Sequence, residues 1–249
     1  MTFSETEAII DYEDSTWTGS GSWRGVERRR SRYVPPKLDS QGRILGNNPV
    51  ELRIIDFVTS GLLLLLLLPL MVVIAAITFI SNPGPVFFKQ SRIGRYGRMF
   101  NCYKFRTMAV DAEARLEKLL AEDPQARIEW EKDFKLRKDP RIVGIGNFLR
   151  KSSLDELPQL FNVLRGDMSL VGPRPIIAAE RTKYGRYIDH YCLVRPGITG
   201  LWQVSGRNDV SYRRRVACDV LFATRANIFD YFKILFMTVP SVLASKGSY

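Results

Sequence analysis

Two acidic side chains that could do chemistry, Asp155 and Glu156, stand next to each other in the stretch KSSLDELPQL (residues 151–160). An ionised aspartate can act as a nucleophile or as a magnesium ligand. Adjacent helical positions do not face each other, so the two carboxylates would serve different tasks, unlike the facing pair of a glycosidase. The formal net charge of the chain is +11, and the basic residues near the pair are Lys138, Arg141, Arg150, Lys151 and Arg165. The stretch is therefore a candidate catalytic pair in a basic pocket.

The same stretch also fits the beginning of an ordinary helix. Ser153 and Glu156 have the spacing of a capping box, and Pro158 suits a first helical turn. Apolar residues then recur at helical spacing up to Gly166, a typical C-terminal stop. We therefore expect a short helix from about Asp155 to Gly166, whose N-terminal dipole would keep Asp155 ionised. On this stretch alone, a structural and a catalytic role are equally open.

Two loops rich in Gly, Pro and Arg follow the pair, at residues 166–180 and 195–208. They carry Arg174, Arg195 and Arg207, and a guanidinium group binds phosphate through two parallel hydrogen bonds and keeps its charge. One such arginine could be a solvated surface charge, but three in tight loops favour a phosphate site. The chain has no GxxxxGK loop and no Asp-x-Asp pair, which disfavours a P-loop NTPase and the usual metal-dependent nucleotide-sugar glycosyltransferase.

Cysteine and histidine usage excludes several other site types. The three cysteines (Cys102, Cys192 and Cys218) are widely spaced and form no CxxC motif, so we expect reduced thiols and no zinc site. His190 is the only histidine, which rules out a multi-histidine metal site and makes a Ser-His-Asp triad improbable; we expect it to be structural or on the surface. The first fourteen residues carry five acids and no Lys or Arg, unlike a secretory signal.

A long uncharged segment, residues 57–80, indicates membrane contact. Its 24 residues exceed the ~20 that a spanning helix needs. A basic chain can bind nucleic acid, an anionic membrane surface or a phosphate-bearing substrate. Here residues 24–53 hold eight Lys and Arg against three acids, and residues 89–106 hold six against none. Because the basic blocks flank the apolar segment, a membrane is favoured over nucleic acid.

Pro69, preceded by Leu68, divides this segment into two halves. Each half would be ~18 Å long as a helix, against a hydrocarbon core of ~30 Å. Lys and Arg prefer the cytoplasmic side, and a helix–break–helix that leaves by the leaflet it entered would keep both basic flanks there. We therefore expect a re-entrant segment bent at Leu68 and Pro69. A kinked spanning helix is the alternative, because membrane helices tolerate proline.

The remaining chain predicts short elements. Residues 82–108 combine a Pro-Gly turn with β-favouring residues and predict short strands or a hairpin leaving the membrane. Residues 109–138 predict charged helices interrupted near Pro124. The expected packing side of these helices comprises Leu116, Leu119, Leu120, Ile128, Trp130 and Phe134.

From about Arg53 to Tyr249 the chain resembles the bacterial sugar transferase family, the monotopic phosphoglycosyl transferases. The resemblance is carried by the proline-interrupted apolar segment and by ordered motifs: PGPVFFKQSRIG, KFRTM, LRKSSLDELPQLFNVLRGDMSLVGPRP, RPGITGLWQVSGRNDVSY and a tail ending in KGSY. It is strongest to the short exopolysaccharide members that lack extra N-terminal spans. Such enzymes transfer a hexose-1-phosphate from a UDP-hexose to undecaprenyl phosphate at the cytoplasmic face of the bacterial inner membrane.

The resemblance implies roles for particular residues. Asp155 would attack the sugar-bearing phosphate, form a covalent phosphosugar intermediate and release UMP, while Glu156 would assist in binding Mg²⁺ or in positioning. Polyprenyl phosphate would then take the phosphosugar. The phosphate-binding residues expected from the family motifs and the arginine-rich loops together are Lys104, Arg106, Arg150, Arg174, Arg195 and Arg207. UDP-galactose or UDP-glucose is the expected donor, with membrane lipid as a further partner, no nucleic acid, and a homodimer as an open alternative.

The expected fold class is α+β. Residues 1–47 are expected to be a mobile cytoplasmic tail, 48–81 the re-entrant membrane segment, and 82–249 a mostly helical catalytic domain with short strands and membrane-associated helices. Two departures from the family bear on this. Leu68 stands where a serine is common, and LFATRAN (221–227) replaces a Tyr and an Asn-Trp-Ser run. A non-catalytic, membrane-tethered scaffold and a nucleic-acid-binding module are the competing hypotheses.

Overall fold

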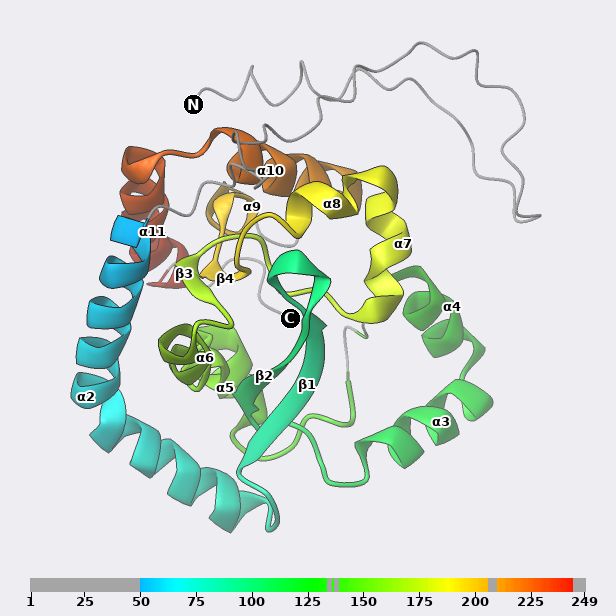
Figure 1. Cartoon of the computed structure of the whole chain (residues 1–249). Helices are drawn as coiled ribbons and strands as arrows, with labels where there is room; N and C mark the ends of the chain where they lie inside the picture. The colour runs from blue at the N-terminus through cyan, green and yellow to red at the C-terminus, as the bar shows by residue number, and fades with distance from the viewer. Residues whose placement is uncertain (1–49, 134–135, 137–138, 206–209, 244–249) are drawn as a thin grey trace, which may run out of the picture.

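A helix of 32 residues, α2 (Val50–Ser81), begins the part of the chain that the computed structural model describes, residues 50–133, 136, 139–205 and 210–243. This helix is long and apolar enough to cross a membrane. It continues as one helix through Pro69, so the expected interruption into two helices is corrected to a proline inside a single helix. Figure 1 shows its axis changing direction partway, which is how a helix accommodates the missing hydrogen bond and the steric clash of an internal proline.

One face of α2 packs on the rest of the protein and the other is exposed. Its buried residues follow a helical spacing: Leu52, Asp56, Ser60, Leu64, Met71, Ile74 and Thr78. This face lies on α6 (Gln159–Arg165) and β3 (Ser169–Val171). Its outer face exposes large apolar side chains, including Leu62, Leu65, Leu66, Val72 and Ile80. The exposed face is therefore suited to lipid rather than to water.

Asp56 fixes the first half of α2 to two other elements. Its carboxylate is 1% exposed, and its Oδ1 accepts hydrogen bonds from Ser169 Oγ (3.1 Å), Leu170 N (2.9 Å) and Tyr231 OH (2.5 Å). Ser169 and Leu170 belong to β3, and Tyr231 belongs to α11 (Ile228–Leu243). A buried carboxylate is tolerated only when its oxygens are hydrogen-bonded. Asp56 therefore joins α2, β3 and α11 at one point.

After α2 the chain forms a β-hairpin, as expected for residues 82–108. Strands β1 (Phe87–Ile93) and β2 (Met99–Phe105) pair antiparallel in a register from Phe87 opposite Phe105 to Ile93 opposite Met99. A 3-10 turn, Arg95–Gly97, closes the tip. The hairpin lies across the front of the domain in Figure 1. Its second strand delivers Lys104 to the candidate site.

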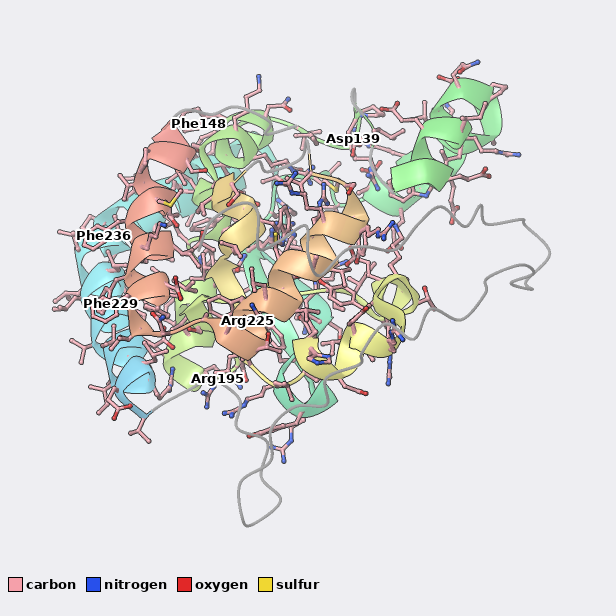
Figure 2. All side chains as sticks on the ribbon, turned by 90° about the horizontal axis from the view of Figure 1, so that it is seen from above. Asp139, Phe148, Arg195, Arg225, Phe229 and Phe236 are labelled. Atoms are coloured by element: carbon pink, nitrogen blue, oxygen red, sulfur yellow. The ribbon has the colours of Figure 1, made fainter. Side chains whose placement is uncertain are left out.

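Two charged helices follow, α3 (Ala112–Glu122) and α4 (Pro124–Asp133), and Pro124 begins the second one as expected. The expected packing side is confirmed in part. Leu116, Leu119, Leu120 and Trp130 are half-buried, but α3 has no fully buried residue and Ile128 is 61% exposed, so these side chains do not form a core. Phe134 lies outside the described residues. Figures 1 and 2 both show these helices projecting from one edge of the domain, where little protein surface is available to cover them.

Helices, two strands and several 3-10 turns make up the rest of the described chain. The helices and strands are α5 (Gly146–Ser152), α6, β3, α7 (Arg181–Tyr184), α8 (Ile188–Tyr191), β4 (Gly197–Thr199), α9 (Leu201–Ser205), α10 (Tyr212–Arg225) and α11. Strands β3 and β4 pair in parallel. The architecture is thus mixed helix and strand with one long apolar helix, which agrees with the expected α+β class.

Glycines allow the loops around β3 and β4 to touch. A Cβ atom added to Gly197 would lie 2.1 Å from Gly172 N, and one added to Gly200 would lie 2.4 Å from Gly172 O. No side chain fits at such distances, so only glycine permits this approach. The contact places the loop that carries Arg174 beside the beginning of α9.

Replacing Asp56 by Ala is expected to lower the free energy of unfolding by about 1–3 kcal/mol or more, because three buried donors lose their acceptor. Thermal unfolding of the protein in detergent measures this effect. Glu51→Ala, in the same helix at an exposed position, is the matched control and should leave the midpoint unchanged. Equal stability of the Asp56→Ala and Glu51→Ala variants would show that Asp56 does not anchor the helix.

Candidate active site

The acidic pair lies on a 3-10 turn, Leu154–Glu156, between α5 and α6. Ser153 does not cap a helix with its side chain: it has φ 58° and ends α5 in the left-handed conformation. The expected capping box is therefore wrong, and α6 begins later, at Gln159, with Pro158 before it. The expected end of this helix at Gly166, with φ 89°, is confirmed.

Lys104 from β2 forms the shortest ion pair of the site. Its Nζ lies 2.5 Å from Glu156 Oε1 and 3.8 Å from Asp155 Oδ2. Arg174, in the loop after β3, places Nη1 4.0 Å from Glu156 Oε1. The two acids thus differ in their ion pairs, as expected for adjacent positions. Glu156 pairs with both Lys104 and Arg174, whereas Asp155 pairs with Lys104 at a longer distance than Glu156 does.

Burial and neighbouring charges set the protonation of the pair. Burial raises the pKa of Asp155 to about 6; Lys104 opposes this rise and the Glu156 carboxylate adds to it. Burial also disfavours charge on Glu156, but Lys104 and Arg174 together hold the pKa of Glu156 below its ordinary value. The expectation that a helix dipole keeps Asp155 ionised is wrong, because no regular helix begins there. Nearby cations instead offset the cost of burying its charge.

Arg150 approaches the pair from α5. Its Nε donates a hydrogen bond to Thr107 Oγ1 (2.9 Å). Burial lowers the pKa of Arg150, and the charge of Asp155 opposes that effect, which indicates that the two groups interact. Lys104, Arg150 and Arg174, which stand far apart in the sequence, are therefore brought together around Asp155 and Glu156.

Two other predicted phosphate-binding residues, Arg106 and Arg195, make their hydrogen bonds away from the acidic pair. Arg106 is buried where α2 ends, and its guanidinium donates to the carbonyl of Asn82. Arg195 Nε donates to the carbonyl of Gly166 (2.8 Å), at the opposite end of α6 from the acidic pair. In the described part of the chain neither forms an ion pair with Asp155 or Glu156, and Arg207 lies outside the described residues.

A pocket adjoins the pair and includes residues that the sequence did not single out. Arg92, Gln159, Ile198 and Gln203 line it together with Lys104, Glu156 and Arg174. Burial lowers the pKa of Arg92, and the nearby charge of Arg174 lowers it further, so two guanidinium groups converge there. The sequence contained one indication that Arg92 is functional. Side chains alternate between the two faces of a predicted hairpin, and a basic side chain on the face that the protein covers needs an anionic partner or ligand.

The carboxylates of the site bear on the magnesium ion that the resemblance implies. No group of three His, Cys, Asp or Glu residues gathers in the described ranges, so a metal held by protein groups alone does not fit. Asp155 and Glu156 supply two adjacent carboxylates in a cation-rich pocket. Mg²⁺ typically binds one or two carboxylates and takes its remaining ligands from substrate phosphates and water. The residues therefore fit a magnesium ion that arrives with, or is completed by, a phosphate substrate.

Comparison with known proteins decides the family. The family model described as bacterial sugar transferase matches residues 48–245. The chain belongs to the bacterial sugar transferase family. This confirms the resemblance drawn from the motifs.

Three relatives from this family illustrate its range. An undecaprenyl-phosphate galactose phosphotransferase of Salmonella typhimurium is 50% identical over 198 residues, 79% of this chain and 41% of that protein. The exopolysaccharide production protein ExoY of Rhizobium meliloti is 46% identical over 197 residues, 79% of this chain and 87% of that protein. A UDP-glucose:undecaprenyl-phosphate glucose-1-phosphate transferase of Escherichia coli is 37% identical over 232 residues, 90% of this chain and 46% of that protein. The aligned part of this sugar transferase thus spans less than half of two of these relatives.

Lys104→Met is expected to lower the turnover of sugar transfer by about 10²–10³-fold, the typical cost of removing one preorganised group that stabilises developing charge. Methionine keeps the length of the side chain and removes the charge that faces both carboxylates. Lys89→Met, at an exposed position on the paired strand of the same hairpin, is the control. Initial rates with a UDP-sugar and undecaprenyl phosphate compare the two. Similar rates for both variants would remove Lys104 from the site.

Proposed function

We propose that this protein transfers a hexose-1-phosphate from a UDP-hexose to undecaprenyl phosphate and releases UMP, through a covalent intermediate on Asp155. The observation that carries the proposal is the unequal use of the two acids. Lys104 Nζ is 2.5 Å from Glu156 Oε1 but 3.8 Å from Asp155 Oδ2. Glu156 is thus engaged by its cations, and Asp155 keeps an oxygen that can approach phosphorus.

The first half-reaction begins when an ionised Asp155 oxygen attacks the phosphorus that bears the hexose. The bond from that phosphorus to the bridging oxygen breaks, UMP leaves with the bridging oxygen, and a phosphosugar remains on Asp155. In the second half, a phosphate oxygen of undecaprenyl phosphate attacks the same phosphorus. The acyl phosphate bond breaks, the carboxylate of Asp155 is restored, and the hexose is left on undecaprenyl diphosphate. The atoms balance without a further reactant.

The cations around the pair supply what phosphoryl transfer needs, which is mainly positioning and charge neutralisation. Lys104 and Arg174 converge on Glu156, and Arg150 interacts with Asp155 from α5. We assign these three cations to the phosphates of the donor. Arg92, which lines the same pocket, joins them. Arg106 and Arg195 are assigned instead to holding the ends of α2 and α6, where each donates to a backbone carbonyl.

A magnesium ion is included in the proposal. When bound, it would neutralise diphosphate charge and stabilise the leaving UMP. Asp155 and Glu156 are the residues that would hold it. The charge of Lys104 lowers the pKa of Glu156, which favours the ionised carboxylate that a magnesium ligand requires.

The identity of the sugar is proposed from the relatives. The printed name of the Salmonella typhimurium protein specifies galactose, and that of the Escherichia coli protein specifies glucose. UDP-galactose and UDP-glucose are therefore the two donors to test first. The name of the Rhizobium meliloti relative supports a role in exopolysaccharide production.

The proposed location is the cytoplasmic face of the bacterial inner membrane, with α2 as a re-entrant helix. Basic blocks on both sides of the apolar segment support this topology, as does the exposed apolar face of α2. A spanning helix with the same bend would put one basic block on the opposite side.

A burst of UMP, at most one per enzyme molecule, is expected when the correct UDP-hexose is added without acceptor, because the covalent step precedes acceptor binding. Intact-protein mass should rise by one phosphohexose and fall again on adding undecaprenyl phosphate. Asp155→Asn keeps the shape but loses the oxyanion, so it should give neither burst nor adduct. Binding of UMP is the control for its fold. A burst from Asp155→Asn would exclude the covalent role of Asp155. If the unsubstituted protein released UMP only after undecaprenyl phosphate was added, direct transfer would be indicated, and no UMP under either condition would indicate a non-catalytic scaffold.

The topology is tested with single cysteines, Leu45→Cys and Lys89→Cys, in a protein whose three native cysteines are replaced. A membrane-impermeant thiol reagent should label both from the cytoplasmic side and neither from the other side. Labelling of the two positions from opposite sides would establish a spanning helix.

A further inference from the structure

An apolar cavity of about 120 Å³ lies between α9, α10 and α11. Its inner wall is formed by buried side chains, among them Trp202, Leu221 and Ile234. Its charged residues are the exposed Arg214 and Lys233 and the half-buried Asp230, so two positive charges stand against one negative charge. The cavity therefore runs from the surface into the core, and it is separate from the pocket beside Asp155 and Glu156.

The helix that closes one side of this cavity, α11, belongs to the apolar surface of the protein. Phe229, Phe236 and Val239 are 81%, 73% and 60% exposed. Figure 2 shows Phe229 and Phe236 on the same side of the molecule as α2, and the Tyr231–Asp56 hydrogen bond joins the two helices. Exposed aromatic and aliphatic side chains on adjacent helices indicate a lipid-facing surface. The cavity thus lies directly behind a helix that faces lipid.

The catalytic pocket lies on the other side of α9. Gln203 lines the catalytic pocket, whereas its neighbours Trp202 and Val204 line the cavity. An α-helix with its side chains is ~10–12 Å across, so the two spaces are separated by about one helix diameter. A molecule with a phosphate at one end and a hydrocarbon chain at the other is long enough to reach both spaces by passing around this five-residue helix.

We infer that this cavity holds the part of the isoprenoid chain next to the phosphate of the acceptor lipid; the inference rests on the proposed function. The wall supplies apolar surface for a branched hydrocarbon. Arg214 and Lys233 at the rim supply positive charge that attracts the lipid phosphate from the headgroup layer. A cavity of this volume takes one chain in part, so the remainder of the isoprenoid stays in the membrane along α11. An ordinary phospholipid, with two chains on an esterified glycerol, suits it less well.

Filling the rim of the cavity from α11 tests the inference. Met237 lines the cavity and is 40% exposed, so Met237→Trp adds volume without disturbing the buried wall. The KM for undecaprenyl phosphate should rise tenfold or more, while the UMP burst without acceptor stays intact. Val239→Trp, two residues along the same helix on its lipid-facing side, is the matched control and should change neither. An unchanged KM in Met237→Trp with an intact burst would overturn the inference.

A second measurement does not depend on any variant. Undecaprenyl phosphate that carries a photoreactive diazirine in its phosphate-proximal isoprene unit is crosslinked to the full-length protein in lipid vesicles, and the labelled peptides are mapped by mass spectrometry. Labelling of α9, α10 and the cavity side of α11 is expected, and label confined to α2 would overturn the inference. The UMP burst reports on the proposed function separately: label in the cavity of a protein that never releases UMP would support lipid binding and reject the transferase.

Discussion

The site depends on one electrostatic constraint, which is that two adjacent carboxylates, Asp155 and Glu156, are withdrawn from water on the same short turn. Such a pair is unfavourable unless cations lie within a few ångströms, because burial and mutual repulsion both disfavour charge. The cations come from three elements: Lys104 from β2, Arg150 from α5 and Arg174 from the loop after β3. The hairpin must therefore pack on the turn, and the glycine contact between the β3 and β4 loops must bring Arg174 to it. A fold of short helices with few strands meets this constraint through local contacts rather than through a large sheet.

The apolar helix α2 is built into the same arrangement. Asp56 ties its first half to β3 and α11, Arg53 donates to the carbonyls of Val163 and Leu164 near the end of α6, and Arg106 meets the carbonyl of Asn82 just beyond its last turn. Each contact uses a charged side chain to satisfy backbone groups or buried donors that would otherwise be unpaired. A helix that was only an anchor would need no such ties. The acidic pair lies on the turn just before α6, so the position of α2 sets the position of that turn.

The sequence allowed prediction of the elements that depend on local patterns. The long apolar helix, the hairpin, the beginning of α4 at Pro124 and the end of the helix at Gly166 all follow from periodicity, proline or glycine, and the structure agrees.

The predicted capping box was wrong because Ser153 ends α5 in a left-handed conformation and so cannot also cap the next helix. A motif of four residues does not reveal that the preceding helix ends at its first residue. The predicted packing side of α3 and α4 is only half-buried, because amphipathic spacing does not say whether another element is there to cover it. Among the arginines, type and loop composition could not separate Arg174, which reaches Glu156, from Arg106 and Arg195, which reach backbone carbonyls. That distinction depends on tertiary contacts, which the sequence does not show. The acidic pair was therefore predictable, whereas its full set of cationic partners was not.

The placement of the arginines also bears on how one pocket can serve two large anions in succession. In the proposed reaction, a pocket built wholly of fixed cations would bind UMP and lipid phosphate too tightly to exchange them, whereas here Glu156 already neutralises part of the charge of Lys104 and Arg174. Phosphate oxygens that approach Lys104 and Arg174 compete with the carboxylate of Glu156. The free energy of phosphate binding is therefore the difference between the cation–phosphate and the cation–carboxylate interactions, which is less than a full new ion pair would give. Asp155, whose pKa lies near 6, is ionised at neutral pH at modest cost. In the proposed mechanism its carboxylate charge is lost when the phosphosugar forms on it. The phosphoryl group of that adduct carries one negative charge in place of the carboxylate, so the charge beside the cations is unchanged until the next phosphate arrives.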